Sequence, residues 1–222
     1  MKEALGYPRG SMGPDSIVLA SASARRSQLL DQIGVRHRVV APDIDEALKP
    51  GELAAAYVER LAEGKALAVV RSYGDRLREP VLAADTAIVL GERIFGKPAS
   101  ESDCVEMLTA LGGRTHAVLT AVALWHEGRL QRALSASQVM FRAIAVEECR
   151  CYWASGEPAG KAGGYAIQGL GAVFVQRLEG SFSGVMGLPL FETAVLLDDA
   201  GVRRWSGAAF SGTGGLPHLS KH

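Results

Sequence analysis

The stretch SIVLASASARRSQLL, residues 16–30, indicates the kind of fold that the chain adopts. Ser16–Ala20 is short and apolar, as a buried strand is, and Ala24–Ile33 has the pattern of a helix that a following glycine ends. Ser21 and Ser23 lie between the two as candidate N-caps of the helix. The stretch therefore predicts a buried strand that leads through a serine-bearing turn into a helix.

Arg25 and Arg26 fall in the first turn of this helix, where a positive charge is unfavourable. The helix N-terminus already carries about half a positive charge, and a cation there costs roughly 0.3–1 kcal/mol. A bound anion would compensate both guanidiniums, because serines, free helical N–H groups and two arginines together make a phosphate site. Alternatively, both side chains point to solvent or to a nearby carboxylate, and this stretch alone does not choose between the two interpretations.

The composition is that of an ordinary globular protein of 222 residues, 48% hydrophobic and 22% charged. The 24 basic and 24 acidic residues give no net charge, so we expect no nucleic-acid or membrane partner, and any anion binding should be local. The three cysteines form no C-x-x-C motif, which favours a reducing compartment over a disulfide framework or a zinc site. Without an apolar run near the ~18 residues of a membrane span, and without the apolar core of a signal peptide, the sequence predicts a cytoplasmic protein.

A loose extension over residues 1–15 and a disordered tail over residues 206–222 are expected to flank a single domain over residues 16–205. The predicted strands of this domain are Ser16–Ala20, Arg38–Ala41, Val81–Ala84, Ala87–Leu90, Arg93–Phe95, Ala117–Trp125, Ala133–Phe141 and Gly171–Leu178. The predicted helices are Ala24–Ile33, Glu52–Ser72, Ser100–Leu111, Val146–Ala154 and Pro189–Leu197. Interspersed helices and hairpins predict an α/β fold, with a mixed, twisted sheet and flanking helices.

Asp85 lies between the apolar runs VLAA and AIVL, where an aspartate is unusual. Aspartate is disfavoured in strands, and burial of its charge is costly without a partner. We therefore favour a metal ligand or a general base over a structural aspartate. Thr86 could donate a hydrogen bond to a ligand, although threonine is also simply a good strand residue.

Two lysines are weaker candidates. Lys65 lies on the same helix face as Tyr57 and Leu61, where a lysine either extends to solvent or meets an anion. Lys97, in the sequence FGKP, follows a predicted strand, and Pro98 keeps it extended. On its own, each lysine is more simply explained as a solvated side chain.

An acidic cluster, Asp43, Asp45 and Glu46, offers the oxygen ligands that hard divalent cations prefer, although a solvated acidic loop is the simpler interpretation. In KAGGYAIQG, residues 161–169, the glycines permit close backbone approach, and the Gln168 amide can donate and accept, which suits a neutral base edge. A tight connection between elements is the alternative.

No phosphate-binding P-loop, dinucleotide fingerprint, H-E-x-x-H motif or hydrolase nucleophile elbow occurs in the sequence. Basic groups suited to phosphate, carboxylates suited to a metal and the lack of a recognisable nucleophile together favour metal-assisted attack by water.

The chain resembles the Maf family of nucleoside triphosphate pyrophosphatases. The matching segments lie in order over about residues 17–197 and are LASASARRSQLL, AADTAIV with GKP, GGRTHAVLTAV, SGEPAGKAGGYAIQGLGAVFV and GSFSGVMGLPLFETAVLL. The chain departs from the family at Ala24, where proline is usual, and at Gly160, where aspartate is common. Proline would fit a first-turn helix position, so we expect only a local effect.

This resemblance implies a fold like that of the inosine triphosphate pyrophosphatases, with two lobes around a cleft, and hydrolysis of a nucleoside triphosphate between its α- and β-phosphates. It implies that Asp85 is the catalytic acid/base and that Asp85 and Glu46 hold a divalent cation, Mg²⁺ or Mn²⁺. The substrate-binding residues that we expect, partly at positions carried over from the family, are Ser21, Arg25, Arg26, Lys65, Thr86, Lys97 and Gln168.

The segment around Gln168 resembles the branch of the family that acts on dTTP and UTP. Uracil and thymine present one N–H between two carbonyls, which an amide can match. The two bases differ by one methyl group, which changes the binding free energy by only ~1–3 kcal/mol, so modified pyrimidines should also be accepted. The alternatives are hydrolysis of 7-methyl-GTP, or a septum-formation regulator that acts through protein binding. A homodimer is one assembly state that the sequence leaves open.

Overall fold

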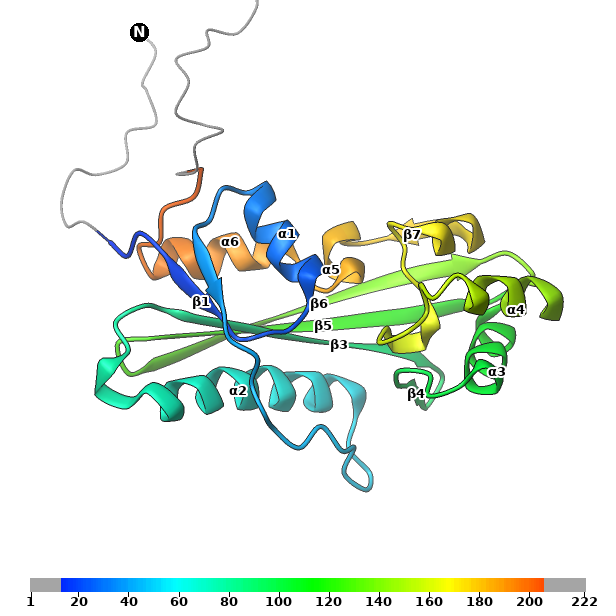
Figure 1. The fold of residues 1–222 in the computed structure, drawn as a ribbon, viewed down its shortest axis with the longest axis horizontal. Coiled ribbons are helices and arrows are strands. Elements are labelled where there is room, and N and C mark those ends of the chain that lie inside the picture. Colours follow the sequence, from blue (N-terminus) through cyan, green and yellow to red (C-terminus); the bar gives the residue numbers. More distant parts are fainter. Residues whose placement is uncertain (1–12, 206–222) are drawn as a thin grey trace, which may run out of the picture.

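The computed structural model describes residues 13–205 and contains one seven-stranded mixed sheet with helices packed against it (Figure 1). The strands are β1 (Ile17–Leu19), β2 (His37–Val39), β3 (Val81–Leu90), β4 (Arg93–Phe95), β5 (Thr115–His126), β6 (Arg129–Phe141) and β7 (Val175–Glu179). The helices are α1 (Ala24–Gln32), α2 (Ala54–Tyr73), α3 (Glu101–Leu111), α4 (Val146–Ala154), α5 (Phe182–Met186) and α6 (Leu190–Asp199). The predicted α/β class and mixed sheet are confirmed.

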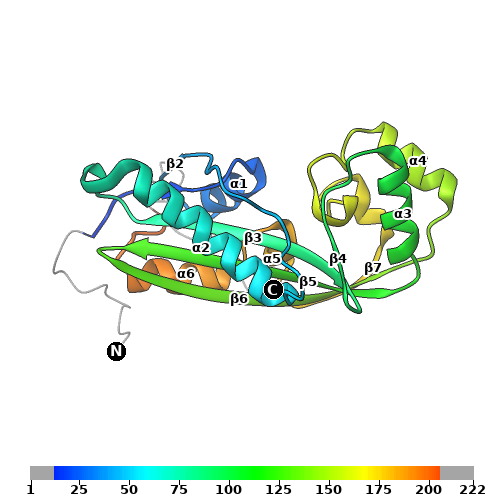
Figure 2. The same cartoon turned by 90° about the horizontal axis from the view of Figure 1, so that it is seen from below.

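The strands lie in the order β2-β1-β3-β5-β6-β7, and β4 pairs with β3. β1 is parallel to β2 and to β3, whereas the long strands β3, β5 and β6 are antiparallel to one another. Figure 2 shows that α3 and α4 gather at one end of the long strands, while α1, α2 and α6 flank the other end. This arrangement confirms the predicted two lobes, which the long strands connect.

Side-chain alternation along β3 assigns its residues to two separate cores, because successive strand residues point to opposite faces of the sheet. Val81, Ala83 and Ala87 share a buried cluster with Val58, Ala62, Ala66 and Val69 of α2. Leu82 and Ala84 belong to the cluster that α1 and α6 cover. The same alternation directs Asp85 toward α2 and Thr86 toward the opposite face.

The edge of β3 that faces away from β5 is only partly paired. β1 pairs with Val81–Leu82, and β4 pairs with Ile88–Leu90. Within residues 13–205, no strand pairs with Ala83–Ala87 along this edge. The sheet therefore has a gap in its edge between the two lobes, beside Asp85 and Thr86.

The observed elements differ from the predicted ones in three places. The two runs around Asp85 form one strand, β3, because Lys65 provides a partner for the buried carboxylate. The predicted strand Gly171–Leu178 begins instead as a 3-10 helix, Leu170–Phe174, and only Val175–Glu179 forms a strand. The short helix α5 was not expected.

The extension and the tail lie outside the described residues, apart from residues 13–15. Within the described range, no helix is both long enough and apolar enough to cross a membrane.

Candidate active site

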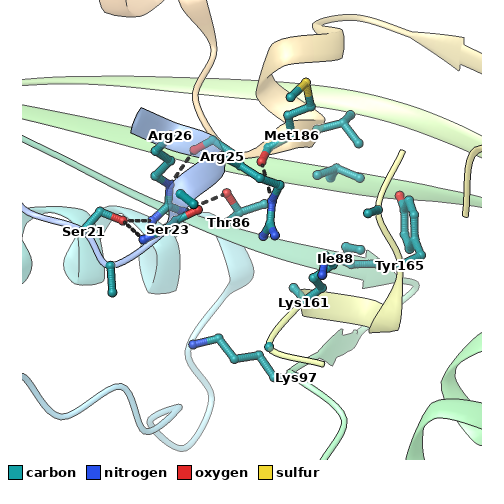
Figure 3. A pocket seen from close by; sticks show the side chains of 18 of the residues that line it. Ser21, Ser23, Arg25, Arg26, Thr86, Ile88, Lys97, Lys161, Tyr165 and Met186 are labelled. Carbon is teal, nitrogen blue, oxygen red and sulfur yellow. Dashed lines mark hydrogen bonds between the residues drawn. The ribbon is translucent and has the colours of Figure 1, made fainter. Parts of the chain in front are cut away.

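A cavity of about 390 Å³ opens at the gap in the edge of β3, and segments of both lobes line it (Figure 3). This volume lies within the usual range for small-molecule sites. Eight of the nine residues predicted for the site line the cavity: Ser21, Arg25, Arg26, Glu46, Lys65, Thr86, Lys97 and Gln168. Asp85, the ninth, lies directly behind Lys65.

Helix α1 points its N-terminus at the cavity, because the chain turns from β1 into α1 within Ala20–Ser23. Ser23 occupies the N-cap position, but its hydroxyl accepts no capping hydrogen bond. The Ser21 hydroxyl instead accepts from the Ser23 N–H at 3.2 Å. Ala24 is the first helical residue, a position at which proline would also fit.

The protein itself holds the guanidinium of Arg26. Its Nε donates to the Gly187 carbonyl at 2.7 Å, and its terminal nitrogens donate to Ser21 Oγ at 3.1 Å and Thr86 Oγ1 at 3.3 Å. Burial lowers the pKa of Arg26, and nearby Asp85 opposes this change. Protein acceptors thus supply much of the compensation that a bound anion would otherwise provide.

Thr86 continues this chain of hydrogen bonds. Thr120 donates its hydroxyl hydrogen to the Gly184 carbonyl at 2.8 Å, so Thr86 is the donor in the 3.0 Å contact between the two threonine hydroxyls. In this arrangement the Thr86 hydrogen is directed at Thr120, and donation from Thr86 to a ligand stays a prediction. Thr86 acts here as a link that orients Arg26.

Arg25 is the more available of the two arginines. Among the described residues, its one side-chain hydrogen bond is a long contact of 3.4 Å from Nε to the Met186 carbonyl. Burial lowers the pKa of Arg25, and the negative charge of Glu157 acts in the opposite direction. Figure 3 shows Arg25, Lys97 and Lys161 entering the same space from three separate segments.

Lys65 links two carboxylates on the α2 side of the sheet. Its Nζ lies 2.6 Å from Asp85 Oδ1 and 2.6 Å from Glu46 Oε1. Lys65 and Asp85 are only 7% and 8% exposed, so this ion pair is largely shielded from water. Lys65 therefore belongs to the buried face of α2 as predicted, but it meets anions and does not extend to solvent.

Glu46 extends the row of alternating charges toward the opening, because its Oε2 lies 3.3 Å from Lys97 Nζ. Burial raises the pKa of Glu46, but Lys65 and Lys97 outweigh burial, and the net pKa is lowered. The rest of the acidic cluster, Asp43 and Asp45, is exposed. Only Glu46 of this cluster faces the cavity, and the simpler interpretation holds for the other two.

Two carboxylates of this site, Glu46 and Asp85, suit a divalent cation whose remaining ligands come from a bound molecule. Within residues 13–205, no group of three or more histidine, cysteine, aspartate or glutamate side chains could hold a metal alone. Glu46 and Asp85 nevertheless converge on one point, now held by Lys65. Since Mg²⁺ is commonly bound by one or two carboxylates together with phosphate oxygens, these two residues suit such a site.

Residues from the segment between Gly160 and Gln168 line the cavity opposite α1. Gly163 adopts φ +64°, its N–H donates to the Gly96 carbonyl at 2.9 Å, and a Cβ there would lie 2.6 Å from Ile88 Cδ1. This close packing explains the glycine at position 163. Gln168 is exposed at the cavity, and its side-chain amide makes no hydrogen bond to the described part of the chain.

Lys161 and Tyr165 also line the cavity, although the sequence analysis did not select them. Both lie within KAGGYAIQG, so the motif itself was the available signal. The cavity therefore presents five basic side chains against one lining carboxylate, Glu46, in a protein of zero net charge; the five are Arg25, Arg26, Lys65, Lys97 and Lys161. Such a concentration of positive charge suits a polyanion.

Part of the lining is apolar and includes Ile88, Val118, Ala166 and Tyr165. The Tyr165 hydroxyl points away into the core, where it lies 2.9 Å from His116 Nε2. His116 is 1% exposed and packs edge-on against Phe141. His116 is thus a core residue of β5.

We expect His116 to make the protein less stable in mild acid, because burial lowers its pKa from 6.5 to about 4. Between these two values the unfolded chain binds the proton and the folded chain does not, so stability falls as the pH falls. Between pH 7.5 and pH 5 this residue should remove about 2 kcal/mol from the free energy of unfolding. Urea unfolding of wild type and His116→Gln at both pH values measures the difference, and equal pH dependence of the two proteins would contradict it.

The chain is similar in sequence to a known protein family and to several known proteins. The family model described as Maf-like protein matches residues 16–200. The chain is 47% identical over 197 residues to a dTTP/UTP pyrophosphatase of Hahella chejuensis, and the aligned region covers 89% of this chain and 98% of the relative. It is 49% identical over 194 residues to a dTTP/UTP pyrophosphatase of Saccharophagus degradans, and the aligned region covers 87% of this chain and 92% of the relative.

A third relative, a dTTP/UTP pyrophosphatase of Bordetella parapertussis, is 48% identical over 195 residues, or 85% of this chain and 94% of the relative. Among solved structures, the Ham1 protein of Staphylococcus aureus matches 72% of this chain and 79% of its own with 16% identity and a TM-score of 0.37.

Proposed function

We propose, from the premise that this chain belongs to the Maf family, that its cavity hydrolyses dTTP and UTP to the nucleoside monophosphate and pyrophosphate. One observation of the structure carries the proposal. Five basic side chains, Glu46 and an apolar wall with a free amide, that of Gln168, line a single cavity, and Asp85 lies directly behind one of the five, Lys65. A triphosphate, a catalytic carboxylate and a pyrimidine base can each be matched to one part of this site.

The phosphates are assigned to the basic part of the cavity. Arg25, Lys97 and Lys161 approach from α1, from the connection after β4 and from the segment before Tyr165, so they can surround a flexible triphosphate. Fixed positive groups that match charge developing on departing pyrophosphate lower the barrier, because they need no reorganisation during the reaction. Arg26, which Thr86 and Gly187 orient, completes this surface.

Asp85 is proposed as the group that activates water. Its Oδ1 is held by Lys65, so Oδ2 remains to take the proton as the water oxygen bonds to the α-phosphorus and the bond to the bridging oxygen breaks. Lys65 covers the carboxylate in this structure. We infer that phosphate oxygens draw Lys65 toward them and so open Asp85 to water.

Glu46 and Asp85 would hold the divalent cation, Mg²⁺ or Mn²⁺, which when bound polarises phosphate oxygens and neutralises their charge. Lys65, which now pairs with both carboxylates, would compete with the cation for them.

The base is assigned to the apolar part of the cavity, between Ile88, Val118 and Tyr165, with Gln168 at its rim. The amide of Gln168 can accept from the N3–H of uracil or thymine and donate to a neighbouring carbonyl. A difference of one methyl group changes binding by only ~1–3 kcal/mol, so dTTP, UTP and pyrimidines modified at the 5-position should all be substrates.

Pyrophosphate release from a panel of nucleotides tests this proposal. The panel contains dTTP, UTP, CTP, ITP, 7-methyl-GTP and the common purine triphosphates, each with Mg²⁺. We expect dTTP and UTP to give the largest kcat/KM. Preference for 7-methyl-GTP would overturn the assignment of the base, and release from none of them by folded protein would favour the regulatory alternative.

We further propose that the enzyme acts in the cytoplasm, on free nucleotides and without a nucleic-acid or membrane partner. The three cysteines are free thiols, as suits a reducing compartment, and the zero net charge gives no attraction for a polyanionic surface outside the cavity.

A further inference from the structure

We propose that Glu157 is the positioning residue that fixes Gln168 and thereby makes the enzyme select uracil over cytosine. The inference rests on the proposed function, since it concerns the base that the same cavity takes. Glu157 does not line the cavity and was not among the residues expected in the site. It lies in the connection after α4, at the start of the segment whose far end carries Gln168.

The carboxylate of Glu157 closes this segment by accepting three hydrogen bonds. Its Oε1 accepts from the Gly171 N–H at 2.9 Å and from the Tyr152 hydroxyl at 2.7 Å. Its Oε2 accepts from the Leu170 N–H at 2.9 Å. One side chain therefore anchors the backbone two and three residues beyond Gln168.

Tyr152 adds a second anchor on the other side of Gln168, because its hydroxyl oxygen accepts from the Ala166 N–H at 3.1 Å. Gln168 thus lies between two backbone positions that the Glu157–Tyr152 pair holds. Its own amide makes no hydrogen bond to the described residues, so the only restraint the structure shows on that side chain comes through its backbone.

The packing leaves little freedom for this arrangement to change. A Cβ at Gly169 would lie 2.1 Å from Glu157 Oε2, and a Cβ at Gly171 would lie 2.6 Å from the Tyr152 hydroxyl oxygen. Glycine at these two positions lets the backbone pass directly over the carboxylate and the phenol.

The carboxylate must remain ionised to accept three hydrogen bonds, and its surroundings favour this state. Burial raises the pKa of Glu157, but the hydrogen bonds from Tyr152, Gly171 and Leu170 outweigh burial, and the net pKa is lowered. Lys161 contributes in the same direction and also donates from Nζ to the Glu157 carbonyl. A glutamine of equal size would place an NH₂ group against one of these donors, so it would lose at least one bond.

Selection between uracil and cytosine requires a fixed amide. Uracil offers a donor at N3 beside an acceptor at O4, whereas cytosine offers an acceptor at N3 beside a donor at N4. A glutamine amide that turns over can satisfy either pattern, because it carries both a carbonyl and an NH₂ group. By holding the backbone on both sides of Gln168, Glu157 and Tyr152 restrict where the amide meets the edge of the base, and the contribution of the amide to selecting uracil depends on that placement.

The test compares kcat/KM for UTP and CTP in wild type, Glu157→Gln and Glu157→Asp. Aspartate keeps the charge but is one methylene shorter and cannot reach both N–H groups, so it serves if the glutamine variant does not fold. We expect either variant to reduce the UTP/CTP ratio by about tenfold, mostly through a higher KM for UTP. Thermal unfolding followed by circular dichroism checks that each protein is folded.

Glu148→Gln is the matched control. Glu148 lies on α4 in the same lobe, binds Arg142 through both oxygens and accepts from the Ala145 N–H at 3.2 Å, but it does not line the cavity. Its substitution should lower stability and leave the UTP/CTP ratio unchanged. An unchanged ratio in the folded Glu157 variants, with wild type active on UTP, overturns this inference alone. A wild-type protein that does not hydrolyse UTP overturns the proposed function, and the inference with it.

Discussion

Replacing Asp85 with asparagine is expected to lower kcat for UTP hydrolysis by roughly 10²–10⁴-fold, which is the range that a positioned proton acceptor contributes. The amide can still accept a hydrogen bond from Lys65, now 2.6 Å from Asp85 Oδ1, but it cannot take a proton from water. Glu46 remains to pair with Lys65, so the variant should fold. Steady-state kinetics measures the loss, and circular dichroism checks the fold.

Asp198→Asn is the matched control for this substitution. Asp198 lies on α6 and accepts two hydrogen bonds from Arg204, away from the cavity. Its replacement should change kcat less than twofold, as expected for a residue outside the site. Full activity of the Asp85→Asn enzyme would refute the assignment of Asp85 as the group that activates water.

Replacing Lys65 with methionine should have two effects, one on activity and one on metal binding. Loss of the ammonium leaves the buried Asp85 carboxylate unpaired beside the half-buried Glu46, which should cost about 3–5 kcal/mol of stability and roughly 10²-fold in kcat. The ammonium no longer competes for the carboxylate oxygens, so Mn²⁺ alone should raise the Tm of the variant by several degrees more than that of wild type.

Lys49→Met tests whether this response belongs to the site. Lys49 is exposed in the same connection between β2 and α2 that carries Glu46, but it does not line the cavity. The control should keep wild-type activity and the wild-type response to Mn²⁺. An equal response of the Lys65→Met and wild-type proteins to Mn²⁺ would contradict the pairing of Glu46 and Asp85 as metal ligands.

Local periodicity was enough to predict several contacts of this fold. The helical spacing placed Lys65 on the buried face of α2, and the apolar runs on both sides of Asp85 indicated that this carboxylate is buried. The first helix and α4 were predicted closely for the same reason: the elements depend on short-range patterns of apolar residues and on turn residues.

Long-range pairings were not predictable from these patterns. Arg26 donates to the carbonyl of Gly187, 161 residues away, and the gap beside Asp85 depends on where β1 and β4 end against β3. The apolar residues before Val175 resembled a strand. In the structure the N–H groups of Leu170 and Gly171 donate to the Glu157 carboxylate, and these residues begin a 3-10 helix. Only the folded chain shows that Glu157 and Gln168 belong together.

Hydrolysis of UTP in ¹⁸O-labelled water is the most direct test of the central claim that water attacks the α-phosphorus within this cavity. The products are analysed by mass spectrometry after less than one turnover, with Mg²⁺ present. We predict that UMP carries one ¹⁸O atom and that pyrophosphate carries none. Label in pyrophosphate, or formation of UDP and inorganic phosphate, would contradict the claim.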